Sequence, residues 1–291
     1  MINRRNFIRY GMLATAGSLY VPEWLHGRSA GYKRGIRILH TNDFHSHVDP
    51  FPANHPLHAN MGGIENLRSL ILDNRPLDES FLLLDCGDIF QGTPYFNLFG
   101  GVPEMIWMNH AGYHATTLGN HDFDNGVEKL AELLKHANFP AVNCNYDFHE
   151  TALNNMVKPY QIFKRSGIKI GITGVGIDLD GLVQAPLRKG VVYRDPVEWV
   201  QKTVDHLRKK EHCEMIIVLS HLGYQYPGNK IDDQKLAKAT NGIDLILGGH
   251  THTFLDEPVK FKNISGKEVI INQAGWAGLR LGKIDFIMDH I

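Results

Sequence analysis

The chain has 291 residues, of which 43% are hydrophobic, and its formal net charge is −1. This length fits one large globular domain or two small ones. Because the charge is balanced and no long basic run occurs, nothing in the composition points to a nucleic-acid polymer or a membrane surface as a partner. The three cysteines have no metal-type spacing, and their odd number excludes a fully paired disulfide framework within one chain.

Residues 1–30 differ in character from the rest of the chain. A basic segment with Arg4 and Arg5 precedes a mildly apolar, Gly/Ala-rich stretch that is too short to span a bilayer. This arrangement resembles a twin-arginine signal and predicts export to the periplasm. The alternative is an ordinary basic N-terminus of a cytosolic protein. No later run reaches membrane length, so we expect residues 31–291 to form one domain without stable membrane insertion.

From residue 36 onwards, short apolar runs alternate with amphipathic segments. Three segments have helical patterns: 64–74, 126–138 and 195–211. Nine runs are typical of strands: 36–40, 80–86, 115–119, 140–145, 169–176, 214–221, 244–250, 268–274 and 282–289. Residues 88–100 are expected to be a loop that frames a binding site at the strand ends. Strands that alternate with helices favour mostly parallel sheets covered by helices, so we predict an α/β layered fold.

Five of the predicted strands are followed by metal-binding types of side chain, most of them beside glycine. In chain order these are Asp43 and His45, then Asp88, then Asn120, His121, Asp122 and Asp124, then His221, and last His250 and His252. In an open α/β sheet, ligands bind outside the carboxyl ends of the strands. A single polar loop rich in histidine would carry little information, but five strand ends of this kind predict one shared site.

The spacing of these residues fits metal coordination. Residues i and i+2 of an extended segment point to the same side, so Asp43 and His45 can bind one ion. Asn120 and His121 are adjacent and must diverge, so one can bind metal while the other faces a substrate. A ligand set of three to four His, two Asp and one Asn, with no thiolate, suits Zn, Mn or Fe. Seven such ligands are too many for one tetrahedral zinc and fit two divalent ions that share a carboxylate.

The motifs together resemble the calcineurin-like metallophosphoesterase superfamily. They read Asp-x-His, Gly-Asp, Gly-Asn-His-Asp, His and Gly-His-x-His in this order, and the strings "LDCGDIFQGTPYF" and "DLILGGHTHT" are similar to the 5′-nucleotidase branch in particular. The resemblance covers residues 36–291. It implies a four-layer α/β/β/α sandwich of two mixed sheets and a metal-dependent phosphoric ester hydrolase that uses an activated water as nucleophile.

The resemblance also implies a role for each site residue. One metal ion would be bound by Asp43, His45, Asp88 and His252. The other would be bound by Asp88, Asn120, His221 and His250, with Asp88 bridging. The catalytic histidine would be His121, which stabilises charge on the phosphoryl group or assists the leaving group, and Asp124 would orient it.

The resemblance leaves the substrate open. In full-length 5′-nucleotidases a second domain binds the base and ribose, whereas this sequence ends at Ile291, so we expect the catalytic domain only. The expected substrate is a small phosphomonoester such as a 5′-nucleotide. Alternatives are cyclic nucleotides, nucleotide-sugars or thiosulfate esters, or a catalytic subunit that needs a separately encoded base-binding partner. A non-catalytic metal-binding module is disfavoured because His121 and Asp124 are both present.

Overall fold

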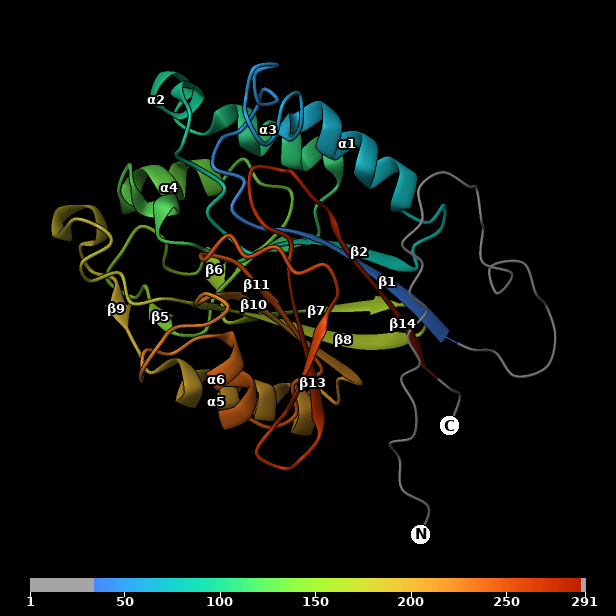
Figure 1. Ribbon diagram of the computed structural model, residues 1–291. Coiled ribbons are helices and arrows are strands. Elements are labelled where there is room, and N and C mark those ends of the chain that lie inside the picture. The colour runs from blue at the N-terminus through green and yellow to red at the C-terminus, as the bar shows by residue number, and fades with distance from the viewer. Residues whose placement is uncertain (1–33, 289–291) are drawn as a thin grey trace, which may run out of the picture.

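The computed structural model describes residues 34–288, which form two large sheets and a small two-stranded one (Figure 1). The first sheet has the order β14 (Gly282–Met288), β1 (Arg34–Thr41), β2 (Phe81–Asp85), β3 (Ala115–Thr116), β4 (Ala141–Val142) and β6 (Val157–Lys158). Strand β14 is antiparallel to β1, and the other neighbours are parallel. This sheet is therefore mixed, as predicted.

The second large sheet is mixed in the same way. Its order is β12 (Val259–Lys262), β13 (Glu268–Gln273), β11 (Leu245–Gly248), β10 (Met215–His221), β8 (Ile168–Gly176) and β7 (Tyr160–Arg165). Only the two edge strands, β12 and β7, run antiparallel to their neighbours. The small sheet pairs β5 (Tyr146–Asp147) with β9 (Val192–Tyr193).

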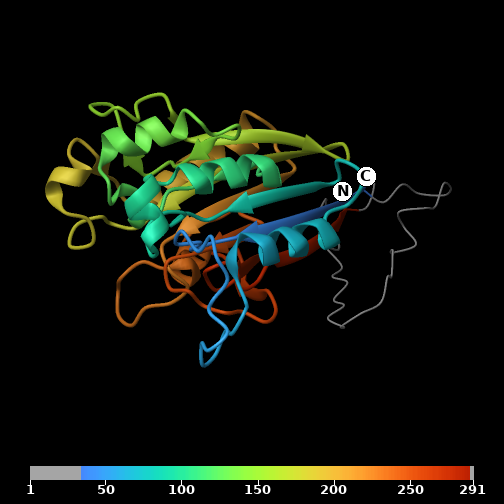
Figure 2. The same ribbon diagram turned by 90° about the horizontal axis from the view of Figure 1, so that it is seen from above.

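Helices cover the outer face of each large sheet, which gives four layers. Helices α1 (Gly63–Asn74), α3 (Val102–Ala111) and α4 (Val127–Leu134) lie over the first sheet, and Figure 2 looks down onto this layer. Helices α5 (Pro196–Lys209) and α6 (Asp233–Ala239) lie against the second sheet. The α/β/β/α sandwich that the resemblance implied is confirmed.

Strand alternation explains why the two sheets pack face to face. In β1 and β2, alternate residues point into the layer between the sheets, where Ile36, Ile38, Leu82 and Leu84 meet Ile172 and Ile217 of the second sheet. The residues between them, such as Leu39 and Leu83, pack instead against the helices. Because both faces of these strands are buried, the sequence shows continuous apolar runs rather than alternation.

All nine predicted strands are present, and the three predicted helices correspond to α1, α4 and α5. Helix α5 begins as predicted, because the side chain of Asp195 accepts a hydrogen bond from the backbone N–H of Glu198 at 2.8 Å. The expectation that 88–100 is only a loop is wrong, since it contains α2 (Pro94–Phe99), a short helix with proline at its start.

Within residues 34–288, no helix is long and apolar enough to cross a membrane. The predicted signal region, residues 1–30, lies outside the described residues.

Candidate metal centre

The loops after β1 and β11 bring three predicted ligands together. Side-chain donor atoms of Asp43, His45 and His252 all lie within 4.8 Å of one another. The two imidazole Nε2 atoms are 2.9 Å apart, and Oδ1 of Asp43 lies 3.4 Å from Nε2 of His252. Three donor atoms that converge in this way from segments about 200 residues apart form a candidate cation site.

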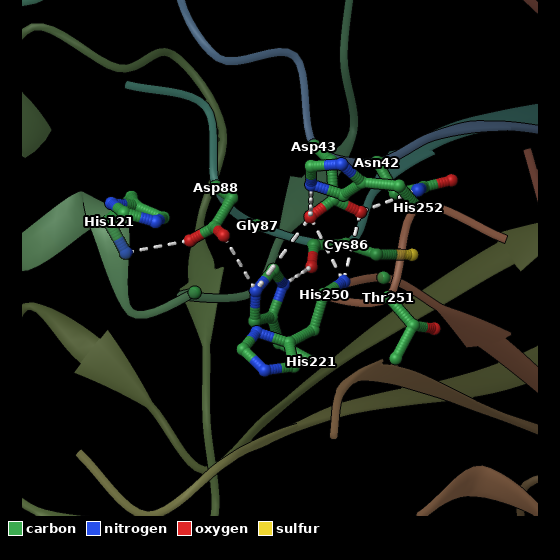
Figure 3. Close-up of polar contacts among 12 residues, drawn as sticks. Asn42, Asp43, Cys86, Gly87, Asp88, His121, His221, His250, Thr251 and His252 are labelled. Atoms are coloured by element: carbon green, nitrogen blue, oxygen red, sulfur yellow. Dashed lines mark hydrogen bonds and ion pairs between the residues drawn. The ribbon is translucent and has the colours of Figure 1, made fainter. Parts of the chain in front are cut away.

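A second group lies beside the first (Figure 3). It consists of Asp88 after β2, His221 at the end of β10 and His250 after β11, again within 4.8 Å. The carboxylate of Asp88 lies between the groups, because its Oδ2 is 3.0 Å from Nε2 of His221 and 3.9 Å from Nε2 of His45. The structure thus provides two candidate ligand groups side by side, with the carboxylate of Asp88 between them.

Backbone carbonyls orient two of the imidazoles. Nδ1 of His45 lies 2.8 Å from the carbonyl oxygen of Gln91, and Nδ1 of His221 lies 2.7 Å from that of Cys86. A carbonyl can only accept, so in each ring Nδ1 carries a proton and Nε2 is the nitrogen that points into the site. A metal ion bound there would take the place of any proton on Nε2.

The charges of the site also suit cations. Burial lowers the pKa of His45 and lowers that of His250 to about 4, so both rings are neutral at pH 7 and can donate a lone pair. Burial opposes protonation of His221 too, but the carboxylates of Asp88 and Asp43 raise its pKa. The carboxylates of Asp43 and Asp88 therefore favour positive charge near the ring of His221.

Asn120 contributes a buried oxygen without a partner. Its Oδ1 is inaccessible to solvent and makes no hydrogen bond to any described residue. Its neighbour His121 donates its backbone N–H to Oδ1 of Asp88 at 2.8 Å, which brings Asn120 close to that carboxylate. A buried carbonyl oxygen without a donor is costly, so this oxygen fits a metal ligand. The residues present therefore fit the predicted ions.

The ligand loops have an unusual backbone. Five of the seven predicted ligands have positive φ angles between 51° and 73°: Asp43, His45, Asp88, His250 and His252. Such angles are uncommon outside glycine, although Asp and His tolerate them better than most residues. Sharp turns of this kind direct side chains back over the strand ends, and strained backbone of this type clusters at functional sites.

The side chain of His121 lies at the edge of the two groups. It follows β3, in the 3₁₀ turn η2 (His121–Phe123), and its ring centroid is 5.3 Å from that of His45. Nδ1 of His121 lies 2.7 Å from Oδ2 of Asp124, and this hydrogen bond is the main reason that its pKa is raised. Asp124 therefore holds the ring with Nε2 free and favours its protonated form.

The supporting roles of two residues were not predicted. Asp122 is fully buried and accepts backbone N–H bonds from Asp88, Ile89 and Gly119, at 3.1, 2.9 and 2.8 Å, so it ties the loop after β2 to the loop after β3. Asn42 donates to Oδ2 of Asp43 at 2.6 Å. Each stands beside a predicted site residue in the sequence, Asp122 after His121 and Asn42 before Asp43, but only the fold shows what they contact.

The site region matches known proteins. The family profile described as calcineurin-like phosphoesterase matches residues 36–254, a range that includes every predicted site residue. Snake venom 5′-nucleotidase from Gloydius brevicauda is 33% identical over 274 residues, which cover 87% of this chain and 45% of that protein. The chain thus spans about half the length of such curated relatives.

Solved structures agree with this match. The 5′-nucleotidase precursor from Thermus thermophilus has a TM-score of 0.78 and 34% identity, over 86% of this chain and 51% of that one. The NAD nucleotidase of Haemophilus influenzae has a TM-score of 0.77 and 27% identity, over 89% and 49% of the two chains. The chain therefore belongs to the calcineurin-like phosphoesterase family of metal-dependent phosphoester hydrolases, and 5′-nucleotidases are among its homologues.

Proposed function

We propose that this chain is a dinuclear metal-dependent hydrolase of phosphomonoesters, with 5′-nucleotides as its substrates. The observation that carries the proposal is the position of Asp88, whose Oδ2 lies 3.0 Å from His221 in one ligand group and 3.9 Å from His45 in the other. A carboxylate with two oxygens can serve both ions, which is the arrangement that two-metal phosphatases use.

The proposed ligand sets follow from the two groups. The first ion is assigned to Asp43, His45, Asp88 and His252, and the second to Asp88, Asn120, His221 and His250. All donors are nitrogen or oxygen, which suits Zn, Mn or Fe. When bound, two such ions supply positive charge that stabilises the phosphoryl oxygens and promotes the ionisation of a water molecule.

The proposed catalytic pair is His121 and Asp124. With Nδ1 bound to Asp124, the protonated ring presents Nε2–H to the substrate. This N–H can donate to a phosphoryl oxygen as charge develops, or give its proton to the departing alkoxide. Because 37% of the His121 side chain is exposed, it can reach a substrate that enters from solvent.

The nucleotide assignment is supported by the relatives. The proteins from Gloydius and Thermus carry the name 5′-nucleotidase, and the one from Haemophilus carries the name NAD nucleotidase. The same chemistry on cyclic nucleotides, nucleotide-sugars or thiosulfate esters remains the alternative. We further propose that residues 1–30 are a twin-arginine-type signal that directs residues 31–291 to the periplasm, which fractionation of cells expressing the tagged chain would test.

The test is phosphate release by the purified, metal-loaded chain. Substrates would be 5′-mononucleotides, 3′-mononucleotides, cyclic nucleotides, nucleotide-sugars, sugar phosphates and a generic aryl phosphate, with thiosulfate esters followed by sulfate release. The proposal predicts the highest kcat/KM for 5′-mononucleotides. Equal, weak release from all of the phosphomonoesters would contradict the nucleotide assignment and favour a separate base-binding protein. A preference for another class would assign that substrate instead.

A further inference from the structure

The four imidazoles of the ligand groups are held in different ways. His45 and His221 are buried and each is oriented by a carbonyl at Nδ1. The ring of His250 is bounded by the rings of His221 and Tyr226, with centroids 5.2 and 6.4 Å away. His252 is the more open ring, because 37% of its side chain is exposed, and like His250 it makes no Nδ1 hydrogen bond to any described residue.

An exposed imidazole without a hydrogen bond at Nδ1 needs another restraint to be a good ligand. Rotation of the ring would move Nε2 away from Asp43 and His45, and the entropy of fixing the ring would weaken metal binding. In Figure 3, His252 lies beside Asp43, and its Nε2 is 3.4 Å from Oδ1 of that carboxylate.

The restraint is the indole of Trp276. The rings of Trp276 and His252 are stacked, with centroids 5.3 Å apart and planes only 5° from parallel. This is the offset-stacked geometry that aromatic pairs prefer. A flat indole against one face of the imidazole limits rotation about χ2, as the carbonyls do for His45 and His221.

Trp276 is itself held firmly. The rings of His47 and Phe51 pack against it at centroid distances of 5.2 and 5.6 Å. The backbone on its two sides is tied to the ligand loops, because Gly275 donates to the carbonyl of Thr253 at 3.0 Å and Ala277 donates to the carbonyl of Asp43 at 2.8 Å. The indole is thus fixed relative to both loops that form the first ligand group.

We propose that Trp276 is a positioning residue that orients His252 for metal binding by stacking, in place of the Nδ1 hydrogen bond that His45 and His221 receive. The inference rests on the ligand assignment made under the proposed function. It adds a residue that carries no ligand atom and that lies outside the metal-binding motifs, in the segment after β13.

The test is a Co²⁺ titration of the metal-free chain, followed by the visible absorption bands of the bound ion. In Trp276→Ala, one of the two Co²⁺ ions should bind about tenfold or more weakly with an altered spectrum, while the other binds as in wild type. Trp276→Phe keeps a flat ring and should restore affinity and spectrum. Trp199→Ala is the matched control, since this half-buried indole lies on α5 against Arg194 and Lys202.

The outcomes distinguish a failure of the positioning role of Trp276 from a failure of the ligand assignment of His252. If Trp276→Ala binds both ions with wild-type affinity and spectrum, the positioning role is overturned. If His252→Ala also binds both ions like wild type, the ligand assignment itself fails. Should the alanine variant not fold, Trp276→Leu, which keeps apolar bulk without a flat ring, replaces it with the same expected loss.

Discussion

At the residue scale, His121 stands apart from the metal ligands although it is adjacent to Asn120. Its backbone N–H bonds to Asp88 while its ring bonds to Asp124, so the main chain supports the candidate metal centre and the side chain is available for the proposed catalytic role. This division separates two properties that can be measured independently, metal content and turnover.

Replacing His121 by alanine should therefore affect only turnover. The backbone bond to Asp88 survives the substitution, so two metal ions should still bind. Turnover should fall about 100-fold or more, as expected when a positioned proton donor is lost. Metal analysis and steady-state kinetics on the same preparation check this. Wild-type turnover would remove His121 from the catalytic role, and loss of metal would make it a ligand.

Asp233 provides a test of buried charge outside the ligand set. It is fully buried, its Oδ2 has no hydrogen-bond partner among the described residues, and burial raises its pKa from 3.8 to about 8. Between these values the folded chain keeps a proton that the unfolded chain releases, so this stabilising contribution is present at about pH 4 and is lost as the pH rises to about 8.

Asp233→Asn should remove that dependence because an amide does not titrate. The variant should gain stability over wild type as the pH rises from about 4 to 8, by at most about 1.4 kcal/mol per pH unit. Urea unfolding of both metal-free chains across this range measures the difference. A difference that stays constant with pH would show that Asp233 is ionised in the folded chain.

The residues of the site fall into those that sequence can reveal and those that it cannot. Asp43, His45, Asp88 and the later histidines follow strands in a repeated pattern, so the chemistry of their side chains points to a metal centre. Trp276 and Asn42 show no such pattern, because an aromatic ring or an amide has many uses. Their roles depend on side-chain contacts that the sequence does not show, of Trp276 with His252 and of Asn42 with its neighbour Asp43.

At the element scale, the loops after β2 and β3 meet at Gly119. A Cβ atom on this glycine would lie 2.1 Å from Oδ1 of Asp88 and 2.6 Å from its backbone nitrogen. No real Cβ approaches other atoms so closely, so a larger residue must displace the loop that carries the shared carboxylate. The glycine is required by this close approach and not by a turn.

Gly119→Ala should therefore weaken metal binding strongly. We expect a loss of affinity of about tenfold or more at both positions, because Asp88 is the proposed shared ligand. Gly181→Ala is the control, since a Cβ there meets nothing within 4 Å and only the positive φ of 76° is strained. Calorimetric titration with the metal compares the two variants. Equal, wild-type affinity in both would show that the loops yield without moving Asp88.

Some helices and strands could be predicted from the sequence and others could not. Long apolar runs gave the central strands correctly, because burial on both faces leaves a clear signal. Strand β12, with the sequence "VKFK", and helix α6, with seven residues, were not predicted. A short edge strand with alternating lysines, and a helix of two turns, have patterns that tertiary packing decides.

At the scale of the whole molecule, the two mixed sheets place five strand ends at one edge of the sandwich. The continuous apolar layer between them fixes the sheets against each other, so loops from both can supply ligands with a defined geometry. Alternating strands and helices indicated an α/β layered fold, but the division into two sheets came from the family resemblance. Apolar runs cannot show which strands share a sheet.

The central claim is that two divalent ions, held by one shared carboxylate, make this fold a phosphoesterase. The most direct measurement is the rate of phosphate release from a 5′-mononucleotide as Mn²⁺ or Zn²⁺ is added stepwise to the metal-free chain. No release is expected without metal, and the rate should reach its plateau at two ions per chain. Full activity in the metal-free chain, or a plateau at one ion, would contradict it.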